Sequence, residues 1–176
     1  MPKIGKHRCV LAIGPLAVKF PLVRVCHYLA VGWRFHFDFA GRGWGLFKEL
    51  ILGGLIENAR EALCYLRTRH QLLAPLYLPL IFVNVYQRKR GVNKFILDGD
   101  KFLCDFLDCA EGSERQNRMD VIAHCSHTFD HPENFSYDEG RVFVLDYGEE
   151  GFENLLAHYA AEIEKHLMSQ ASKNEG

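Results

Sequence analysis

Residues 127–148 carry the most informative pattern in the chain and read HTFDHPENFSYDEGRVFVLDYG. Two short β-prone runs flank a turn at 138–140, which predicts a β-hairpin. Asn134 precedes the first run and Asp146 follows the second, so a hairpin would bring both residues to its open end. Mg²⁺ takes one or two protein oxygens together with phosphates and waters. The pattern therefore predicts a magnesium site at Asn134 and Asp146; the alternative is a turn residue and a strand-end cap.

The same string resembles the catalytic segment of the protein-kinase-like superfamily, whose bacterial small-molecule members often show a His-Pro-x-Asn loop. Here residues 131–134 read HPEN, and DYG at 146–148 matches the family's Asp-Phe-Gly step. In that family the Asn and the Asp hold the magnesium ions that bridge the nucleotide phosphates. The resemblance thus implies that the protein binds ATP and Mg²⁺ and transfers the γ-phosphoryl group to a hydroxyl on a small molecule, a glycan or a protein.

One position of the catalytic loop departs from the family pattern. His127 falls where the family has its loop histidine, but the position of the family's catalytic Asp falls on Phe129. Asp130 comes one residue later. Two interpretations stay open: the loop is one residue shorter and Asp130 accepts the proton of the attacking hydroxyl, or the base is missing and the protein is a pseudokinase.

The N-terminal half contains two further matches. Residues 16–20 read LAVKF and resemble the family's strand motif Val-Ala-x-Lys, which implies that Lys19 contacts the nucleotide phosphates. On a helix predicted over 46–69, Glu61 matches the glutamate that pairs with this lysine, and Glu57 one turn earlier is the alternative. A lysine on a hairpin edge and a glutamate on a solvated helix face are the ordinary structural interpretations. No glycine-rich phosphate loop precedes the first strand.

The charges are distributed unevenly along the chain. The 176 residues include 21 Lys+Arg and 22 Asp+Glu, and this formal net charge of −1 argues against a dedicated nucleic-acid binder. Residues 1–95 hold 15 of the basic residues and 4 of the acidic ones, whereas residues 96–176 hold 6 and 18. Such a division suits cations that hold phosphates and carboxylates that hold a metal, but two mutually attracting lobes would show it as well.

We expect an α+β protein with a reduced protein-kinase-like fold. Residues 1–86 are predicted to form a small antiparallel sheet with one helix. Residues 87–176 are predicted to form a truncated, mostly helical lobe that holds the hairpin at 127–148 and a C-terminal helix. Only 28 residues follow Gly148, which is enough for one helix.

Local patterns predict the individual elements. Two β-prone runs around Gly14-Pro15 predict a hairpin, and an aromatic-rich stretch with imperfect alternation predicts a further strand with one buried face. The strands predicted in the N-terminal half are 9–13, 16–20, 23–39 and 80–86. A turn is predicted at 41–45, where three glycines alternate with other residues.

Cysteine use and hydropathy bear on the compartment. The six cysteines are irregularly spaced, and most lie inside apolar patterns, as expected for small buried side chains in a reducing cytoplasm. The longest apolar stretch, 72–86, contains Pro75 and Pro79 and is shorter than the roughly 20 residues that a spanning helix needs. We therefore expect a cytoplasmic protein without a membrane span.

A zinc site is a second chemical possibility. Several soft ligands are close in sequence, and four of them would suffice for a tetrahedral site. They are Cys104, Cys109, His124, Cys125, His127 and His131. The absence of any Cys-x-x-Cys pair argues against structural zinc. The run Cys125-Ser126-His127 also suggests a Cys/His nucleophile, although the partners of such dyads usually come from separate parts of a fold.

A non-catalytic interaction module that works without nucleotide is the alternative from a different functional class. A basic set of residues would bind a phosphorylated or acidic partner, and the aromatic stretch at 33–39 would provide stacking. The set comprises Arg67, Arg69, His70, Arg88, Lys89, Arg90 and Lys94. A solvated basic loop is its ordinary structural explanation.

Overall fold

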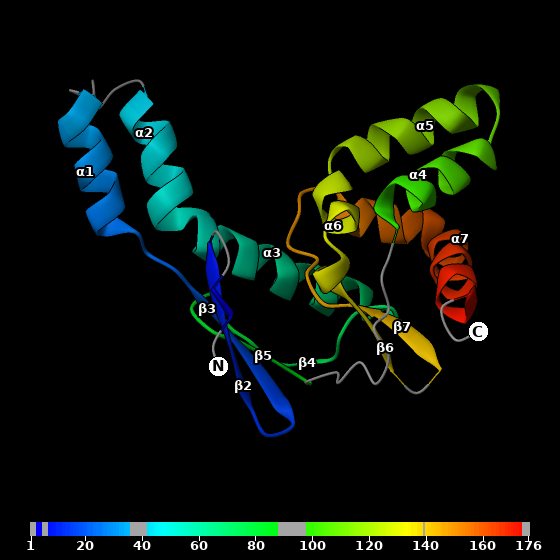
Figure 1. Ribbon diagram of the computed structural model, residues 1–176, viewed down its shortest axis with the longest axis horizontal. Coiled ribbons are helices and arrows are strands. Elements are labelled where there is room, and N and C mark those ends of the chain that lie inside the picture. The colour runs from blue at the N-terminus through cyan, green and yellow to red at the C-terminus, as the bar shows by residue number, and fades with distance from the viewer. Residues whose placement is uncertain (1–2, 5–6, 36–41, 88–97, 139, 174–176) are drawn as a thin grey trace. The chain divides into compact units, whose positions relative to one another are not determined.

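The computed structural model describes residues 3–4, 7–35, 42–87, 98–138 and 140–173 (Figure 1). They form an α+β protein with a small antiparallel sheet and a mostly helical remainder, as predicted. The chain divides into two compact units, Met1–Ala62 with Leu76–Arg88 and Leu63–Pro75 with Lys89–Gly176. The sequence suggested a single division after residue 86. Residues 63–75 instead fall in the second unit, where Leu73 bridges Val144.

The first unit is built on a five-stranded antiparallel sheet in the order β1-β2-β3-β5-β4. Its strands are β1 (Lys3–Ile4), β2 (Arg8–Ile13), β3 (Leu16–Pro21), β4 (Leu76–Pro79) and β5 (Asn84–Gln87). The β2–β3 hairpin turns at Gly14, whose φ of 56° suits glycine. The strand predicted over 80–86 begins only at Asn84, because Leu80 and Val83 exchange backbone hydrogen bonds in a tight turn.

Helices follow the hairpin, and here the sequence-based expectation was wrong. The predicted strand at 23–39 is helix α1 (Val25–Phe35) over most of its length, and its last residues lie outside the described part of the chain. From its second residue onward the predicted turn at 41–45 belongs to α2 (Arg42–Phe47). A π-helical segment (Lys48–Leu52) then leads into α3 (Gly53–Thr68), so the predicted helix at 46–69 is present as several segments.

The start of α3 packs closely on the ends of β2 and β3. A Cβ on Gly54 would lie 2.3 Å from the carbonyl oxygen of His7 and 2.9 Å from Cα of Pro21. Both are backbone atoms, so only glycine allows this approach. The contact brings the next turns of α3 against the sheet, which matters for the charged residues described below.

The second unit is mostly helical. It contains the last residues of α3 and four further α-helices: α4 (Gly99–Asp108), α5 (Gly112–Ala123), α6 (Ser126–Asp130) and α7 (Phe152–Lys173). A short 3-10 segment (Pro132–Asn134) leads into the hairpin of β6 (Phe135–Asp138) and β7 (Arg141–Val144), which confirms the hairpin read from the sequence.

The two units have different interiors. The second unit is centred on aromatic rings: Phe102 stacks on Phe129 with ring centroids 4.4 Å apart, and Phe152 lies 6.3 Å from Phe129. The first unit buries charged residues beside its apolar ones, including Arg8 and Lys19. Within the described residues, no helix has both the length and the apolar character that crossing a bilayer requires.

Candidate functional site

A buried ion pair joins strand β3 to helix α3 in the first unit. Nζ of Lys19 lies 2.6 Å from Oε1 of Glu61, and the two side chains are 8% and 0% exposed. The same ammonium lies 4.8 Å from the ring centroid of Tyr86 on β5. The residues that the resemblance paired are thus in contact, and Glu61 rather than Glu57 is the partner of Lys19.

Glu61 also pairs with a second cation and accepts from a hydroxyl, two groups that the sequence did not single out. Arg8 on β2 places Nη1 2.8 Å from Oε2 of Glu61 and Nε 3.0 Å from Oε2 of Glu57. The hydroxyl of Tyr86 donates a hydrogen bond to the same Oε2 of Glu61. The carboxylate of Glu61 therefore contacts two cations. Its Oε1 faces Lys19, and its Oε2 faces Arg8 and accepts from Tyr86. Two cations and two carboxylates compensate each other, as burial of charge requires.

Asparagines fix the position of Tyr86 relative to α3. Asn84 on β5 donates from Nδ2 to the backbone oxygen of Asn58, 2.9 Å away, and to the hydroxyl of Tyr86 at 3.2 Å. Asn58 in turn donates to the backbone oxygen of Ile81. Both asparagines are fully buried. These bonds tie α3 to β5 and hold the Tyr86 hydroxyl in place beside Glu61.

In the second unit, the β6–β7 hairpin brings Asn134 and Asp146 to its open end. Phe135 pairs with Val144, and the backbone N–H of Leu145 donates to the carbonyl oxygen of Asn134 at 2.6 Å. Asp146 is the next residue along the chain. At the other end of the hairpin, Gly140 has a φ of 74°, which only glycine adopts readily. The hairpin thus places residues 134 and 146 at the same end of the strand pair, as the sequence predicted.

Glu149 holds the loop in front of this hairpin. Its Oε2 accepts from the backbone N–H of Thr128 at 2.8 Å and from the Thr128 hydroxyl at 2.9 Å. Asn134 donates from Nδ2 to the carbonyl oxygen of Thr128, 3.2 Å away. This orientation commits the amide nitrogen of Asn134 to the loop, and Oδ1 is the atom of that side chain suited to a cation. A carboxylate shortly after the Asp-Tyr-Gly step was the only sequence cue to Glu149.

The two candidate catalytic residues lie together on α6. Nδ1 of His127 is 3.4 Å from Oδ2 of Asp130, and their side chains are 80% and 46% exposed. Phe129, between them, is fully buried and stacks on Phe102. The position at which the family carries its base is thus occupied by a core residue here. Asp130 is a carboxylate of this loop that solvent can reach.

The competing chemistries find little support in the geometry. Burial, with a smaller contribution from the negative charge of Glu149, raises the pKa of the Cys125 thiol to about 12, so the thiol is protonated at neutral pH and is a poor nucleophile. Cys109 lies 3.7 Å from Nε2 of His166, which was not among the suggested zinc ligands. Within the described part of the chain, no three His, Cys, Asp or Glu side chains are grouped so that they could hold a metal ion.

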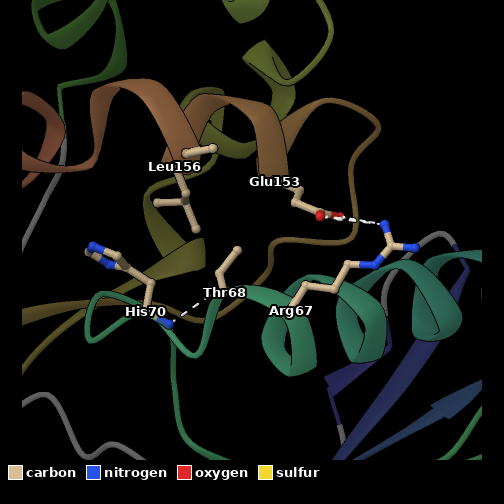
Figure 2. Close-up of a pocket in the computed structure, with 6 residues that line it drawn as sticks. Arg67, Thr68, His70, Glu153 and Leu156 are labelled. Atoms are coloured by element: carbon tan, nitrogen blue, oxygen red, sulfur yellow. Dashed lines mark hydrogen bonds and ion pairs between the residues drawn. The ribbon is translucent and has the colours of Figure 1, made fainter.

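A pocket of about 340 Å³ lies in the second unit and is lined by Arg67, Thr68, His70, Glu153, Leu156 and Ala157, none of them a candidate residue described above (Figure 2). Arg67 and His70 belong to the basic set noted in the sequence. Nη1 of Arg67 lies 3.2 Å from Oε2 of Glu153, as the dashed line in Figure 2 marks. The ion pair neutralises the guanidinium, so the pocket is not a ready anion site. Residues 88–90 and Lys94 of the basic set lie outside the described residues.

The candidate residues are distributed over both units. Lys19 and Glu61 belong to the first unit, and His127, Asp130, Asn134 and Asp146 belong to the second. Each group is well defined within its own unit by the contacts given above. Comparison with protein-family models, curated protein sequences and solved structures gives no match to this chain.

Proposed function

We propose that the protein binds a nucleotide together with Mg²⁺, as a reduced relative of the protein-kinase-like superfamily. Lys19 would contact the nucleotide phosphates, and Glu61 would orient the lysine side chain. Asn134 and Asp146 would be the metal ligands. ATP and Mg²⁺ are the proposed cofactors. The observation that carries the proposal is the buried contact of 2.6 Å between Lys19 on a strand and Glu61 on a helix.

This contact supports the proposal because burying an ion pair costs desolvation free energy and is not the most stable way to fill the space. Burying an ammonium and a carboxylate removes both from water, and an apolar pair of similar volume is often as stable or more so. In kinases a strand lysine and a helix glutamate must be paired for the lysine to reach the phosphates. The lysine motif at 16–20 also lies on the third strand of its sheet, the context that the family motif requires.

The proposal extends to phosphoryl transfer through Asp130. Phosphoryl transfer depends mainly on positioning and on electrostatic stabilisation, so a displaced base slows the reaction rather than changing its nature. With Phe129 buried in the core, we assign the base role to Asp130, supported by its contact with His127. A protein that binds Mg-nucleotide but shows no transfer would be a pseudokinase. The acceptor would be a hydroxyl-bearing small molecule, glycan or protein.

Calorimetric titration with ATP, in Mg²⁺ and in EDTA, tests the metal ligands. The wild type should bind only weakly in EDTA, and Asp146→Ala should lose the difference between the two conditions. Asp108→Ala is the matched control, because Asp108 is an exposed carboxylate at the end of α4 in the same unit. Wild-type binding that is equal in Mg²⁺ and EDTA would contradict the assignment of Asn134 and Asp146 as metal ligands.

Hydrolysis of radiolabelled Mg-ATP and autophosphorylation test catalysis without a known acceptor. Asp130→Ala should lower both rates by a factor of about 10² to 10⁴, the usual contribution of a general base. If Asp130→Ala leaves a measurable rate unchanged, Asp130 is not the base. If the wild type binds no nucleotide at all, the non-catalytic interaction module becomes the better explanation, although the ion pair at Arg67 weakens its basic surface.

A further inference from the structure

Helices α1 and α2 in the first unit expose an unusual amount of apolar surface. Across residues 25–30, only Tyr28 is buried, while Val25 is 46% and Leu29 is 60% exposed. On α2, Trp44 is 54% exposed. A helix of a globular domain normally turns such side chains toward a core. Among the described side chains of α1, at residues 25–30, the apolar ones other than Tyr28 face solvent.

The two helices contact each other and lie side by side (Figure 1). The ring of Phe47 lies between them, edge-on to Tyr28 at 5.7 Å and stacked on Trp44 at 5.5 Å. At the base of the pair, the backbone N–H of Arg24 donates to the carbonyl oxygen of Leu50. The exposed indole is therefore supported from below by other rings and does not belong to a loosely attached loop.

A lysine lies beside this apolar surface, in a stretch of sequence with more basic than acidic residues. Residues 23–50 contain four Arg or Lys and two Asp or Glu. Lys48 is exposed, and its Nζ lies 5.4 Å from the ring centroid of Trp44, while the acidic Glu49 follows it. An exposed tryptophan beside a lysine, next to exposed aliphatic side chains, is the combination found where helices lie at a membrane surface. The indole sits at the depth of the headgroups, and the ammonium attracts anionic lipids.

We propose that the α1–α2 pair is an interfacial binding surface for bilayers that contain anionic phospholipids. The helices would lie on the membrane with Val25, Leu29 and Trp44 in the headgroup region and Lys48 against a lipid phosphate or carboxylate. This surface is separate from the nucleotide proposal and does not depend on it. It requires no spanning helix, because interfacial helices bind parallel to the bilayer plane.

Intrinsic fluorescence tests the proposal directly. The chain has two tryptophans, Trp33 on α1 and Trp44 on α2, so tryptophan emission reports this helix pair alone. Vesicles of phosphatidylcholine with phosphatidylserine should shift the emission to shorter wavelength, and brominated lipids should quench it. The protein should bind vesicles of phosphatidylcholine alone at least several-fold more weakly than vesicles that contain phosphatidylserine. Added salt should weaken its binding to the anionic vesicles.

Variants distinguish binding through this surface from non-specific adsorption of the protein to vesicles. Leu29→Ser should lower the vesicle partition coefficient about tenfold, and Lys48→Glu should lower it several-fold for anionic vesicles only. Phe82→Ser is the matched control, since Phe82 is 69% exposed in the turn before β5 of the same unit, and it should bind as the wild type does. Circular dichroism verifies that each variant is folded.

Three outcomes would overturn the proposal. The first is an emission spectrum that anionic vesicles leave unchanged. The second is vesicle binding that Phe82→Ser abolishes and folded Leu29→Ser does not affect. The third is a blue shift that appears with protein concentration in the absence of vesicles, together with a dimer in analytical ultracentrifugation, because a second copy of the chain would then cover the α1–α2 pair.

Discussion

Glu61→Gln is the substitution that best isolates the buried charges of the first unit. The glutamine keeps the size of the side chain but removes the negative charge that lies 2.6 Å from Lys19 and 2.8 Å from Arg8. At an effective dielectric constant of about 20, each of these contacts is worth about 6 kcal/mol of attraction before desolvation is counted. Removing one partner of a buried ion pair costs about 3–5 kcal/mol net, because the remaining charge stays buried without compensation. We expect a loss in this range.

Urea unfolding followed by tryptophan fluorescence measures this loss. Both tryptophans lie in the first unit, so the transition reports the unit that holds Glu61. Glu57→Gln is the matched control, since Glu57 bonds to Arg8 but is 29% exposed and can be solvated. The control should lose about 1 kcal/mol or less of the free energy of unfolding.

A triple variant, Arg8→Met with Lys19→Met and Glu61→Leu, tests the cause of the loss. Apolar replacement of a whole buried charge cluster is often neutral or stabilising, whereas breaking the cluster is not. We expect the triple variant to be more stable than Glu61→Gln. Two results would contradict this explanation by charge compensation. One is a loss of less than about 1 kcal/mol in the free energy of unfolding of Glu61→Gln, and the other is a triple variant less stable than Glu61→Gln.

Three other changes have expected outcomes. Gly54→Ala should lower the free energy of unfolding in urea by about 1–3 kcal/mol, because the added Cβ would meet backbone atoms. Gly45→Ala should be neutral or stabilising, because there is open space around Gly45 on α2. Equal losses for the two variants would contradict the close packing at Gly54. Alkylation of Cys125 by iodoacetamide, followed by mass spectrometry, should be far slower than that of exposed Cys26 at neutral pH, and equal rates would contradict the burial of the thiol. Because burial raises the pKa of Cys125 from the ordinary value of 9.0 to about 12, its contribution to stability is complete below pH 9 and declines above it. Arg67→Ala should change stability by less than about 1 kcal/mol since its ion pair is exposed, and a larger loss would show that the pocket is structurally important.

Local patterns predicted the parts of the fold that depend on neighbours in sequence. The hairpin around Gly14 and the hairpin at 127–148 follow from alternation and turn residues, and the structure contains both. The pairing of Lys19 with Glu61, 42 residues apart, came from the family resemblance, since periodicity alone left Glu57 equally suitable. The structure selects Glu61 because Glu57 lies a turn away and pairs with Arg8.

Long-range packing decided what the sequence could not. The stretch at 23–39 has the aromatic and β-branched content of a strand, yet Val25–Phe35 is helical, with Tyr28 packed against Phe47. β-Propensity reflects fit to a sheet surface, and this segment has no sheet neighbour within the described residues. Arg8 resembled one more charge in a basic N-terminus, and only the fold reveals its contacts with Glu57 and Glu61.

Calorimetric titration of Lys19→Met with Mg-ATP tests the nucleotide proposal most directly, because Lys19 carries it. We expect the wild type to bind Mg-ATP and Lys19→Met to bind about ten- to a hundredfold more weakly, the loss of one charge-assisted contact to phosphate. Lys101→Met, which removes an exposed lysine on α4, should bind as the wild type does. Equal affinities of the wild type and a folded Lys19→Met, or no binding of Mg-ATP by the wild type, would contradict the proposed function.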